Sequence, residues 1–216
     1  MSVILPSARL FYADVPKVAC TSLKHLFFEA ENGFAFRPFR VNGGPIRHIH
    51  NLYPPMLREK YPEARLQRFD RFCVVRDPIR RFLSAYGNRV RAHGELSQEK
   101  AGAKLTALGL APDPDLDLFI DKLEVYTTAH VAIAHHTRPM VDFLGRDPGY
   151  FTRVYPMEAL GDFRRDINTR LGTDLALPRL QTGGPKFKLD ELTAAQTAKL
   201  KEYYREDYAA FGDYFD

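Results

Sequence analysis

The stretch Val15-Pro16-Lys17-Val18-Ala19-Cys20-Thr21-Ser22-Leu23-Lys24 stands where an apolar run gives way to a segment with helical periodicity. The preceding residues 9–13 have the length and aromatic content of a short buried strand, and the apolar residues that follow recur at helical spacing, at Leu23, Leu26, Phe27 and Ala30. The stretch therefore predicts a strand, a tight loop and a helix. Because the first N–H groups of a helix have no partner within it, an anion binds there readily. We expect a phosphate cradle, to which Thr21 and Ser22 add hydroxyl donors and Lys17 a positive charge.

A second junction of this kind follows the continuous apolar run 71–75, which predicts another buried strand. The run breaks at Arg76-Asp77-Pro78, and apolar residues then recur at three- and four-residue intervals as far as residue 90. An arginine at the end of the strand presents a fork of donors that matches phosphate oxygens. We expect Asp77 to brace the loop, because its carboxylate would repel phosphate, and we expect Arg80 and Arg81 to lie on a solvated face.

The two junctions resemble known nucleotide-binding segments. The spacing of a Walker phosphate loop is absent, because the lysine precedes the turn. The string Pro-Lys-Val-Ala-Cys-Thr-Ser-Leu-Lys resembles instead the 5'-phosphosulfate loop of sulfotransferases that use 3'-phosphoadenosine 5'-phosphosulfate (PAPS), particularly the carbohydrate sulfotransferases. The segment 74–86 resembles their 3'-phosphate-binding segment, in which an arginine and a serine eight residues later hold the nucleotide. Here these residues are Arg76 and Ser84, and Ala19 stands where the family more usually has glycine.

The resemblance implies a role for each motif. It assigns Lys17 the catalytic task of stabilising negative charge on the departing 5'-phosphate. A base is also needed for the acceptor hydroxyl, and imidazole suits this task because its pKa is about 6.5. His48 and His50 resemble the His-x-His pair of uronyl 2-O-sulfotransferases, in which the second histidine is the base, so we prefer His50; two surface histidines would give the same pattern. The residues expected to bind the nucleotide are Pro16, Lys17, Val18, Ala19, Cys20, Thr21, Ser22, Leu23, Arg76, Ser84 and Lys186.

Two further segments offer candidate ligand contacts. Residues 136–139 resemble a His-x-x-Pro passage near the active site of carbohydrate sulfotransferases, so His136 and Arg138 are candidates for binding the acceptor, although we favour a structural role for this histidine. Lys186 follows a Gly-Gly-Pro turn in an expected exposed loop, 177–188, which could close over the nucleotide or meet an acidic acceptor; solvent exposure explains it as well. No cysteine or carboxylate stands at zinc-site spacing around the histidines of residues 130–136, so we expect no metal.

Composition limits the classes of protein that fit. The chain has 216 residues, 45% hydrophobic and 27% charged, which predicts one soluble domain over residues 1–216. The net charge of +4 favours an anionic small-molecule ligand over a nucleic acid, which would require a dense basic stripe. No apolar run is long enough for a membrane span, and no signal-peptide pattern is present. Cys20 and Cys73 are expected to be free thiols in a reducing compartment.

The remaining periodicities predict the other elements. We expect strands at residues 34–41 and 153–155, and helices at 54–63, 97–108, 116–128, 157–170 and, capped by Asp190, 190–208. The aromatic residues after 203 are expected to pack inside the protein. Strands separated by helices indicate an α/β fold with a P-loop-like, mainly parallel sheet flanked by helices, as in sulfotransferases, with ligands at the carboxyl ends of the strands.

The sequence thus predicts a PAPS-dependent sulfotransferase that acts on a hydroxyl of a carbohydrate or glycoconjugate and leaves adenosine 3',5'-bisphosphate (PAP). Two alternatives stay open: a PAP- or glycan-binding module without turnover, and a nucleotide-dependent phosphotransferase. The expected location is the bacterial cytoplasm, the alternative being a trimmed luminal domain of a Golgi enzyme. The oligomeric state is open.

Overall fold

The computed structural model describes residues 2–180 and 183–215, and the chain divides into two compact units. The first unit comprises residues 1–76, 140–181 and 213–216, and the second comprises residues 77–139 and 182–212. No helix in the described ranges is long and apolar enough to cross a membrane. The expected loop 177–188 includes residues 181 and 182, which lie outside the described ranges. The single domain over residues 1–216 stays a prediction.

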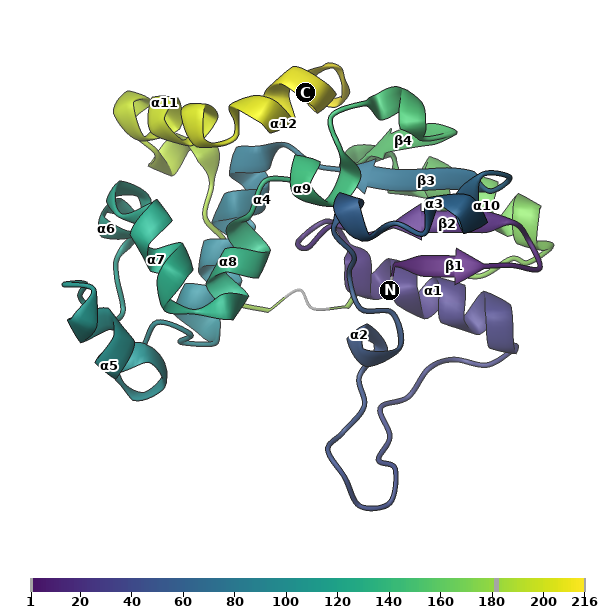
Figure 1. Cartoon of the computed structure of the whole chain (residues 1–216), viewed down its shortest axis with the longest axis horizontal. Coiled ribbons are helices and arrows are strands. Elements are labelled where there is room, and N and C mark those ends of the chain that lie inside the picture. Colours follow the sequence, from purple (N-terminus) through teal and green to yellow (C-terminus); the bar gives the residue numbers. More distant parts are fainter. Residues whose placement is uncertain (1, 181–182, 216) are drawn as a thin grey trace. The chain divides into compact units, whose positions relative to one another are not determined.

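The first unit is built on a four-stranded sheet in the order β1-β2-β3-β4 (Figure 1). Three neighbouring strands, β2 (Leu10–Ala13), β3 (Asp70–Val75) and β4 (Arg153–Pro156), run parallel. β1 (Val3–Leu5) pairs antiparallel with β2. The expected mainly parallel sheet is therefore confirmed. β1 was not predicted, because three residues are too few to show a strand periodicity.

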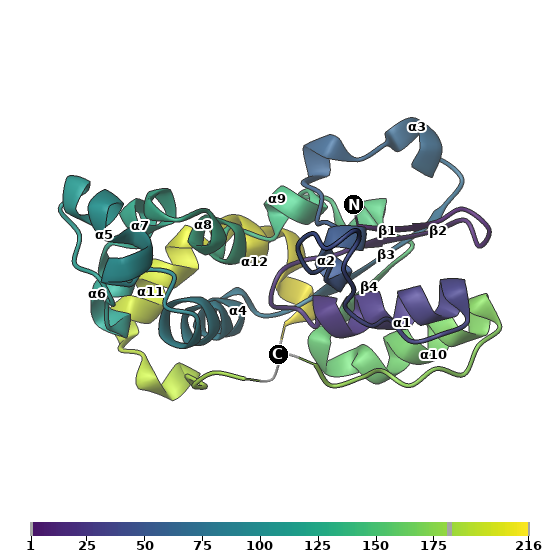
Figure 2. The same cartoon turned by 90° about the horizontal axis from the view of Figure 1, so that it is seen from below.

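Both faces of this sheet are covered. Successive residues of β2 point to opposite sides, so the contacts of Tyr12 and Phe11 show what covers each face. The Tyr12 ring stacks on Phe27 of α1 (Cys20–Asn32), with ring centroids 5.3 Å apart, and meets Phe163 of α10 (Leu160–Leu171) edge-on at 5.5 Å. The Phe11 ring packs on the opposite face against Tyr61, 4.9 Å away. Figure 2 shows α1 and α10 together along one side of the sheet and α3 (Glu63–Leu66) on the other.

Two expected elements of the first unit are wrong. Residues 34–41 form no strand, although all are described; Phe39 alone pairs with Arg47, in one isolated bridge. The alternating aromatic residues there contact one another and α1 instead, as in the Phe28–Phe36 ring pair at 5.2 Å. Residues 54–63 form only a 3-10 helix at Arg58–Lys60, because prolines at 54, 55 and 62 prevent a continuous helix.

The remaining helices of the first unit are short. They are α2 (Ile49–Leu52), α9 (Val141–Leu144) and 3-10 helices at Pro148–Tyr150 and Met157–Ala159, the last of which leads into α10. As expected, α10 ends at Gly172, whose φ of 64° is in the left-handed region. After the second unit, the chain finishes with a 3-10 helix at Gly212–Tyr214.

The second unit is helical, with an aromatic core in which the Phe82 and Phe119 rings stack 5.6 Å apart. Its elements are α4 (Pro78–Ala85), the π-helix Tyr86–Ala92, α5 (Gln98–Ala107), α6 (Leu116–Asp121), α7 (Leu123–Ala129), α8 (Val131–Thr137), a 3-10 helix at Leu189–Glu191, α11 (Ala194–Tyr203) and α12 (Arg205–Phe211).

Three expected boundaries in the second unit are corrected. The helix over residues 116–128 is interrupted at Lys122, where φ is −110° and ψ is 24°. The last helix is capped by Thr193, whose hydroxyl accepts from the Gln196 N–H, and not by Asp190. It also breaks at Tyr204, which is fully buried. The packing role expected for the aromatic C-terminal residues is confirmed for Tyr204 and Phe211, both completely buried.

Candidate functional site

The loop between β2 and α1 has an unusual backbone. Lys17 and Ala19 both have positive φ, at 66° and 50°, and Ala19 is the residue that caps α1. Pro16 and Val18 are buried, so they anchor the loop on either side of the half-exposed Lys17. The strand, tight loop and helix predicted for this stretch are therefore present. The helix α1 is 13 residues long, and its N-terminal turn supplies the N–H groups of an anion-binding site.

The first turn of α1 holds three of the predicted nucleotide-binding residues. The Ser22 hydroxyl accepts a hydrogen bond from the backbone N–H of Leu180, at 3.3 Å. The Thr21 hydroxyl lies 2.9 Å from Nε2 of His50. Burial raises the pKa of the Cys20 thiol, although the nearby Lys24 acts in the opposite direction, so Cys20 is protonated at neutral pH and is a poor nucleophile. Leu23, behind this turn, is fully buried and serves the core.

Arg76 brings the second motif to the first. It ends β3, which is parallel to β2 and beside it, with Ala13 opposite Cys73. Parallel neighbours end at the same edge of a sheet, where ligands bind in α/β folds. The Arg76 Nη1 donates a hydrogen bond to the backbone carbonyl of Lys17, at 3.1 Å. Two motifs that are 59 residues apart in sequence thus meet through one side chain.

The two histidines of the His-x-His pair differ in their surroundings. His48 is exposed and begins α2, where its backbone N–H donates to Oδ1 of Asn51 at 2.7 Å. His50 is half-buried, and its two ring nitrogens lie 2.9 Å from the Thr21 hydroxyl and 3.1 Å from the Lys24 ammonium. The contacts of His50 therefore place it against the first turns of α1, and those of His48 lie within α2.

The second unit holds the other predicted contacts. Ser84 is half-buried in α4. The loop before α4 is braced by Asp77, as expected. Its Oδ1 accepts from the Arg80 N–H at 2.8 Å, and its Oδ2 accepts from the Tyr208 hydroxyl at 2.9 Å. Lys186 is exposed. Ser84 and Lys186 thus belong to the second unit and Arg76 to the first.

The expectation that Arg81 is solvated is wrong. Its side chain is completely buried, and its guanidinium donates to the backbone carbonyls of His136 and Arg138. A cation at the carbonyl end of α8 is favourable because the last carbonyls of a helix lack partners within it. The Tyr204 hydroxyl donates to the Thr137 carbonyl between them, at 2.6 Å. The hydrogen bonds of Arg81 therefore connect the predicted acceptor segment to α4. The neighbouring Arg80 is exposed, as predicted.

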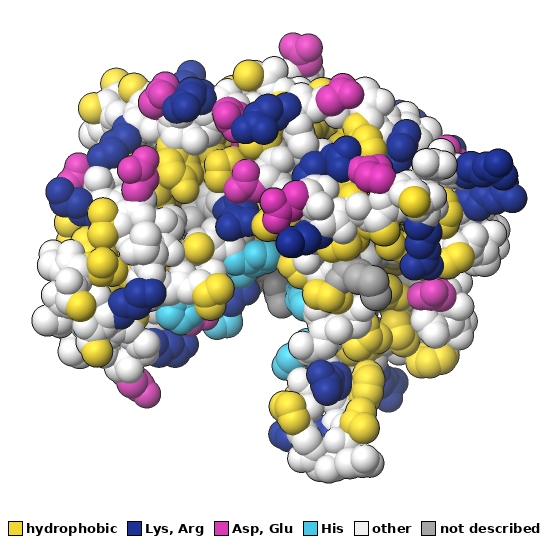
Figure 3. All heavy atoms as spheres, in the orientation of Figure 1, with side chains coloured by type: hydrophobic (Ala, Val, Ile, Leu, Met, Phe, Trp, Pro, Cys, Tyr) yellow, Lys and Arg dark blue, Asp and Glu magenta, His cyan; other side chains and the backbone are white. Residues whose placement is uncertain are grey.

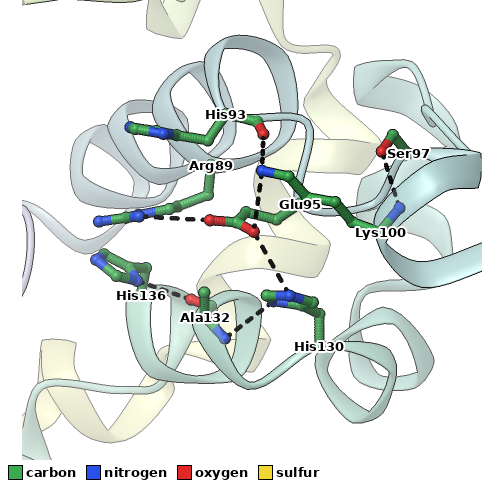
Figure 4. Close-up of polar contacts among 8 residues, drawn as sticks. All are labelled: Arg89, His93, Glu95, Ser97, Lys100, His130, Ala132 and His136. Atoms are coloured by element: carbon green, nitrogen blue, oxygen red, sulfur yellow. Dashed lines mark hydrogen bonds and ion pairs between the residues drawn. The ribbon is translucent and has the colours of Figure 1, made fainter. Parts of the chain in front are cut away.

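The side chains near His136 form a mainly basic cluster (Figure 4). Oε1 of Glu95 lies 3.6 Å from Nη1 of Arg89. Oε2 of the same carboxylate lies 3.7 Å from Nζ of Lys100 and 3.5 Å from Nε2 of His130. The His136 Nδ1 lies 2.7 Å from the Ala132 carbonyl. Because a carbonyl only accepts, Nδ1 carries the proton and Nε2 carries the lone pair of the neutral ring. The contact with Ala132 therefore sets the tautomer of the neutral His136 ring.

Sequence reasoning missed three charged residues, two near the start of α1 and one in the cluster near His136. Lys24 and Asp14 are buried against each other, and Glu95 was not singled out. A lysine next to the apolar stripe of α1 was the one available signal for a buried ion pair. In the described residues, no three His, Cys, Asp or Glu side chains are placed to hold a metal ion. Both cysteines are free, with Cys73 buried and Cys20 half-buried.

Comparison with known proteins gives a consistent result. The sequence profile of the sulfotransferase family (Sulfotransfer_2) matches residues 2–215, which include parts of both units. A mouse (Mus musculus) protein named carbohydrate sulfotransferase 14 is 31% identical over 121 residues, a match that covers 49% of this chain and 28% of the mouse protein. No solved structure matches the chain.

Proposed function

Because the chain belongs to the sulfotransferase family, we propose that it transfers the sulfuryl group of PAPS to a hydroxyl of a carbohydrate or glycoconjugate and leaves PAP. The observation that carries this proposal is the hydrogen bond from Arg76 to the Lys17 carbonyl, at 3.1 Å. It joins the two segments that resemble the 5'-phosphosulfate and 3'-phosphate sites, at the carboxyl ends of adjacent parallel strands.

The residues present fit an anionic nucleotide. The helix N-terminus at Cys20 presents N–H groups, Lys17 is half-exposed beside it, and Arg76 offers a guanidinium fork at the strand end. PAPS would supply an activated sulfuryl group at this place. The chain would hold the 5'-phosphate at the start of α1 and the 3'-phosphate with Arg76 and Ser84.

Lys17 is the proposed electrostatic catalyst. Its side chain extends from a residue with φ of 66°, between two buried neighbours, so the loop sets the direction of the lysine. Negative charge grows on the bridging oxygen as the sulfuryl group departs, and a fixed ammonium stabilises that charge more in the transition state than in the ground state.

The proposed base is His50, supported by its contact with Thr21 in the first turn of α1, where the 5'-phosphate is proposed to bind. A second candidate is His136, because it belongs to the segment 136–139 that resembles a passage near the active site of carbohydrate sulfotransferases. Both candidates act on the acceptor hydroxyl by the same chemistry. A base contributes typically 10²–10⁴-fold to such a reaction.

An anionic acceptor fits the surface near His50. Residues 32–58 contain no Asp or Glu but do contain Arg37, Arg40 and Arg47, which are exposed, and Arg58, which is paired with Glu63. Figure 3 shows the projecting loop between α1 and α2 with dark blue and yellow side chains on the visible face. The yellow side chains are apolar, and Phe34 and Val41 are 62% and 53% exposed. Arginines with exposed apolar side chains suit an acidic glycan, whose sugar faces are apolar and whose substituents are anionic.

The proposal is tested by supplying ³⁵S-labelled PAPS and a panel of acceptors: acidic glycans, neutral glycans, small alcohols and phenols. We expect label to pass to a glycan, and excess PAP to suppress the transfer by competing for the nucleotide site. Transfer only to alcohols or phenols would overturn the carbohydrate assignment. Tight binding of PAP with no transfer to any acceptor would make the protein a PAP-binding module.

The two free cysteine thiols support the further proposal of a reducing, cytoplasmic location.

A further inference from the structure

A series of polar side chains in contact with one another extends from Asp14, at the end of β2, to Thr21, in the first turn of α1. Asp14 and Lys24 are 2% and 0% exposed, and the Lys24 Nζ lies 2.5 Å from Oδ2 of Asp14. The other carboxylate oxygen, Oδ1, accepts a hydrogen bond from the Ser2 hydroxyl at 2.9 Å. Buried charges are retained in proteins when they are paired and hydrogen-bonded, and this pair fixes the position of the Lys24 ammonium.

The ammonium sits against one ring nitrogen of His50. The distance from the Lys24 Nζ to Nδ1 of His50 is 3.1 Å, and Nε2 of the same ring lies 2.9 Å from the Thr21 hydroxyl. A lysine ammonium has donors and no acceptor, so Nδ1 must accept and must carry the lone pair. The neutral ring has one N–H, which is then on Nε2 and donates to the Thr21 oxygen. A proton on Nδ1 would instead oppose the ammonium.

We infer that Lys24, held by Asp14, is a positioning residue that fixes His50 in its Nε2–H tautomer and directs that N–H at Thr21. The order of donation is then Lys24 to Nδ1 and Nε2 to the Thr21 oxygen. With its oxygen accepting from the ring, the Thr21 hydroxyl is held in one orientation, and Thr21 lies in the first turn of α1, at the anion-binding end of the helix. Lys24 therefore orders the Thr21 hydroxyl, in the first turn of α1, through His50.

The Nε2–H tautomer also restricts how His50 acts as a base. In this arrangement its lone pair is on the nitrogen that contacts Lys24, so the ring accepts a proton there only after that contact opens. Lys24 keeps its carboxylate partner, Asp14, when it leaves the ring. This part of the inference rests on the proposed sulfuryl transfer; the tautomer itself does not.

The tautomer can be read directly from the ¹⁵N shifts of the His50 ring in long-range ¹H–¹⁵N spectra of the full chain without nucleotide. We expect Nδ1 to be unprotonated and Nε2 to be protonated at pH 7.5. In Lys24→Met, which removes the ammonium and leaves an unbranched apolar side chain one atom shorter, we expect a mixture of the two tautomers. Lys60→Met removes a lysine that is 70% exposed, and it should leave the His50 shifts unchanged.

Two outcomes would overturn the inference: an Nδ1–H ring in the parent protein, or an unchanged tautomer in Lys24→Met. Because Lys24→Met leaves Asp14 buried without its partner, the variant Asp14→Asn/Lys24→Met, which removes both charges, gives the same test if the single variant does not fold. The parent spectrum needs no substitution at all.

Titration with PAP separates this inference from the proposed function. We expect PAP to bind the parent, and we expect the Asp14→Asn/Lys24→Met variant to bind it about tenfold more weakly because Thr21 loses its ordered partner. If PAP does not bind the parent, the proposed function fails while the tautomer result stands. If PAP binds the parent and the variant equally, the effect on the loop is refuted while the proposed function stands.

Discussion

The guanidinium of Arg76 donates a hydrogen bond to the backbone carbonyl of Lys17, with a distance of 3.1 Å between Nη1 and the oxygen. Arg76 ends β3, and Lys17 lies in the loop that follows the neighbouring parallel strand β2. One side chain therefore supports the loop that carries the proposed catalytic lysine, and its guanidinium lies at the edge of the sheet where β2 and β3 end. Loss of Arg76 should affect both nucleotide affinity and the loop.

Arg76→Ala should weaken PAP binding by roughly 1.5–3 kcal/mol, or about one to two decades in dissociation constant, because a charge-assisted contact to phosphate is lost. Arg76→Lys should recover part of the affinity, since it keeps the charge but not the guanidinium fork. Calorimetric titration with PAP measures both. The control is Arg80→Ala, at an exposed position four residues later, which should bind like the parent. If Arg76→Ala binds PAP as tightly as the parent, our assignment of the 3'-phosphate contact is wrong.

Lys17→Ala should reduce turnover more than it reduces PAP affinity, because the ammonium acts on charge that develops in the transition state. Steady-state kinetics and a PAP titration on the same preparation give the two quantities. Lys60→Ala, which removes a lysine that is 70% exposed, should leave both unchanged. Equal losses in turnover and affinity would reduce Lys17 to a nucleotide-binding residue.

Ala19→Gly should stabilise the protein. Ala19 has a φ of 50°, a conformation that costs a residue with a Cβ roughly 1–2 kcal/mol, and glycine avoids this cost but adds about 0.5–1 kcal/mol of entropy to the unfolded chain. The expected net gain is about 0.5–1 kcal/mol in the free energy of unfolding, measured by urea denaturation. Ala30→Gly, within α1, should have the opposite sign and lose about 1 kcal/mol. A loss in both variants would contradict the strain at residue 19.

The sequence predicted the parallel part of the sheet because short apolar or aromatic runs mark its strands: Leu-Phe-Tyr-Ala in β2, Phe-Cys-Val-Val in β3 and Val-Tyr in β4. Residues 71–75 differ from β3 by a single residue at the start. The aromatic alternation of residues 34–41 failed as a strand signal, because Phe36 packs on Phe28 from a loop and no second strand lies beside it in the described structure. Local periodicity does not distinguish these two origins of the same pattern.

Arg81→Met should destabilise the protein by about 3 kcal/mol. The guanidinium is completely buried, and its removal leaves the His136 and Arg138 carbonyls without their donor. Urea denaturation followed by circular dichroism measures the change. Arg80→Met, at the exposed neighbouring position, should stay within about 0.5 kcal/mol of the parent. Equal stability of the two variants would show that the buried contacts of Arg81 contribute nothing.

The candidate site was predictable where it depends on local sequence, and not where it depends on distant partners. Lys17, Thr21 and Arg76 belong to short motifs, so their positions follow from the strand–loop–helix pattern. The burial of Arg81 follows from carbonyls more than 50 residues away, and that of Lys24 from a carboxylate at the end of another element. Charged residues are mostly exposed, so nothing local indicated that these two are buried.

The most direct test of the account is calorimetric titration of the full chain with PAP in the presence of EDTA, alongside AMP and, separately, ATP with magnesium. If Lys17, the start of α1 and Arg76 form a site for PAPS, PAP should bind without a divalent metal and at least tenfold more tightly than AMP, which lacks the 3'-phosphate. Binding of ATP with magnesium, together with no detectable heat from PAP, would contradict the account and indicate a phosphotransferase.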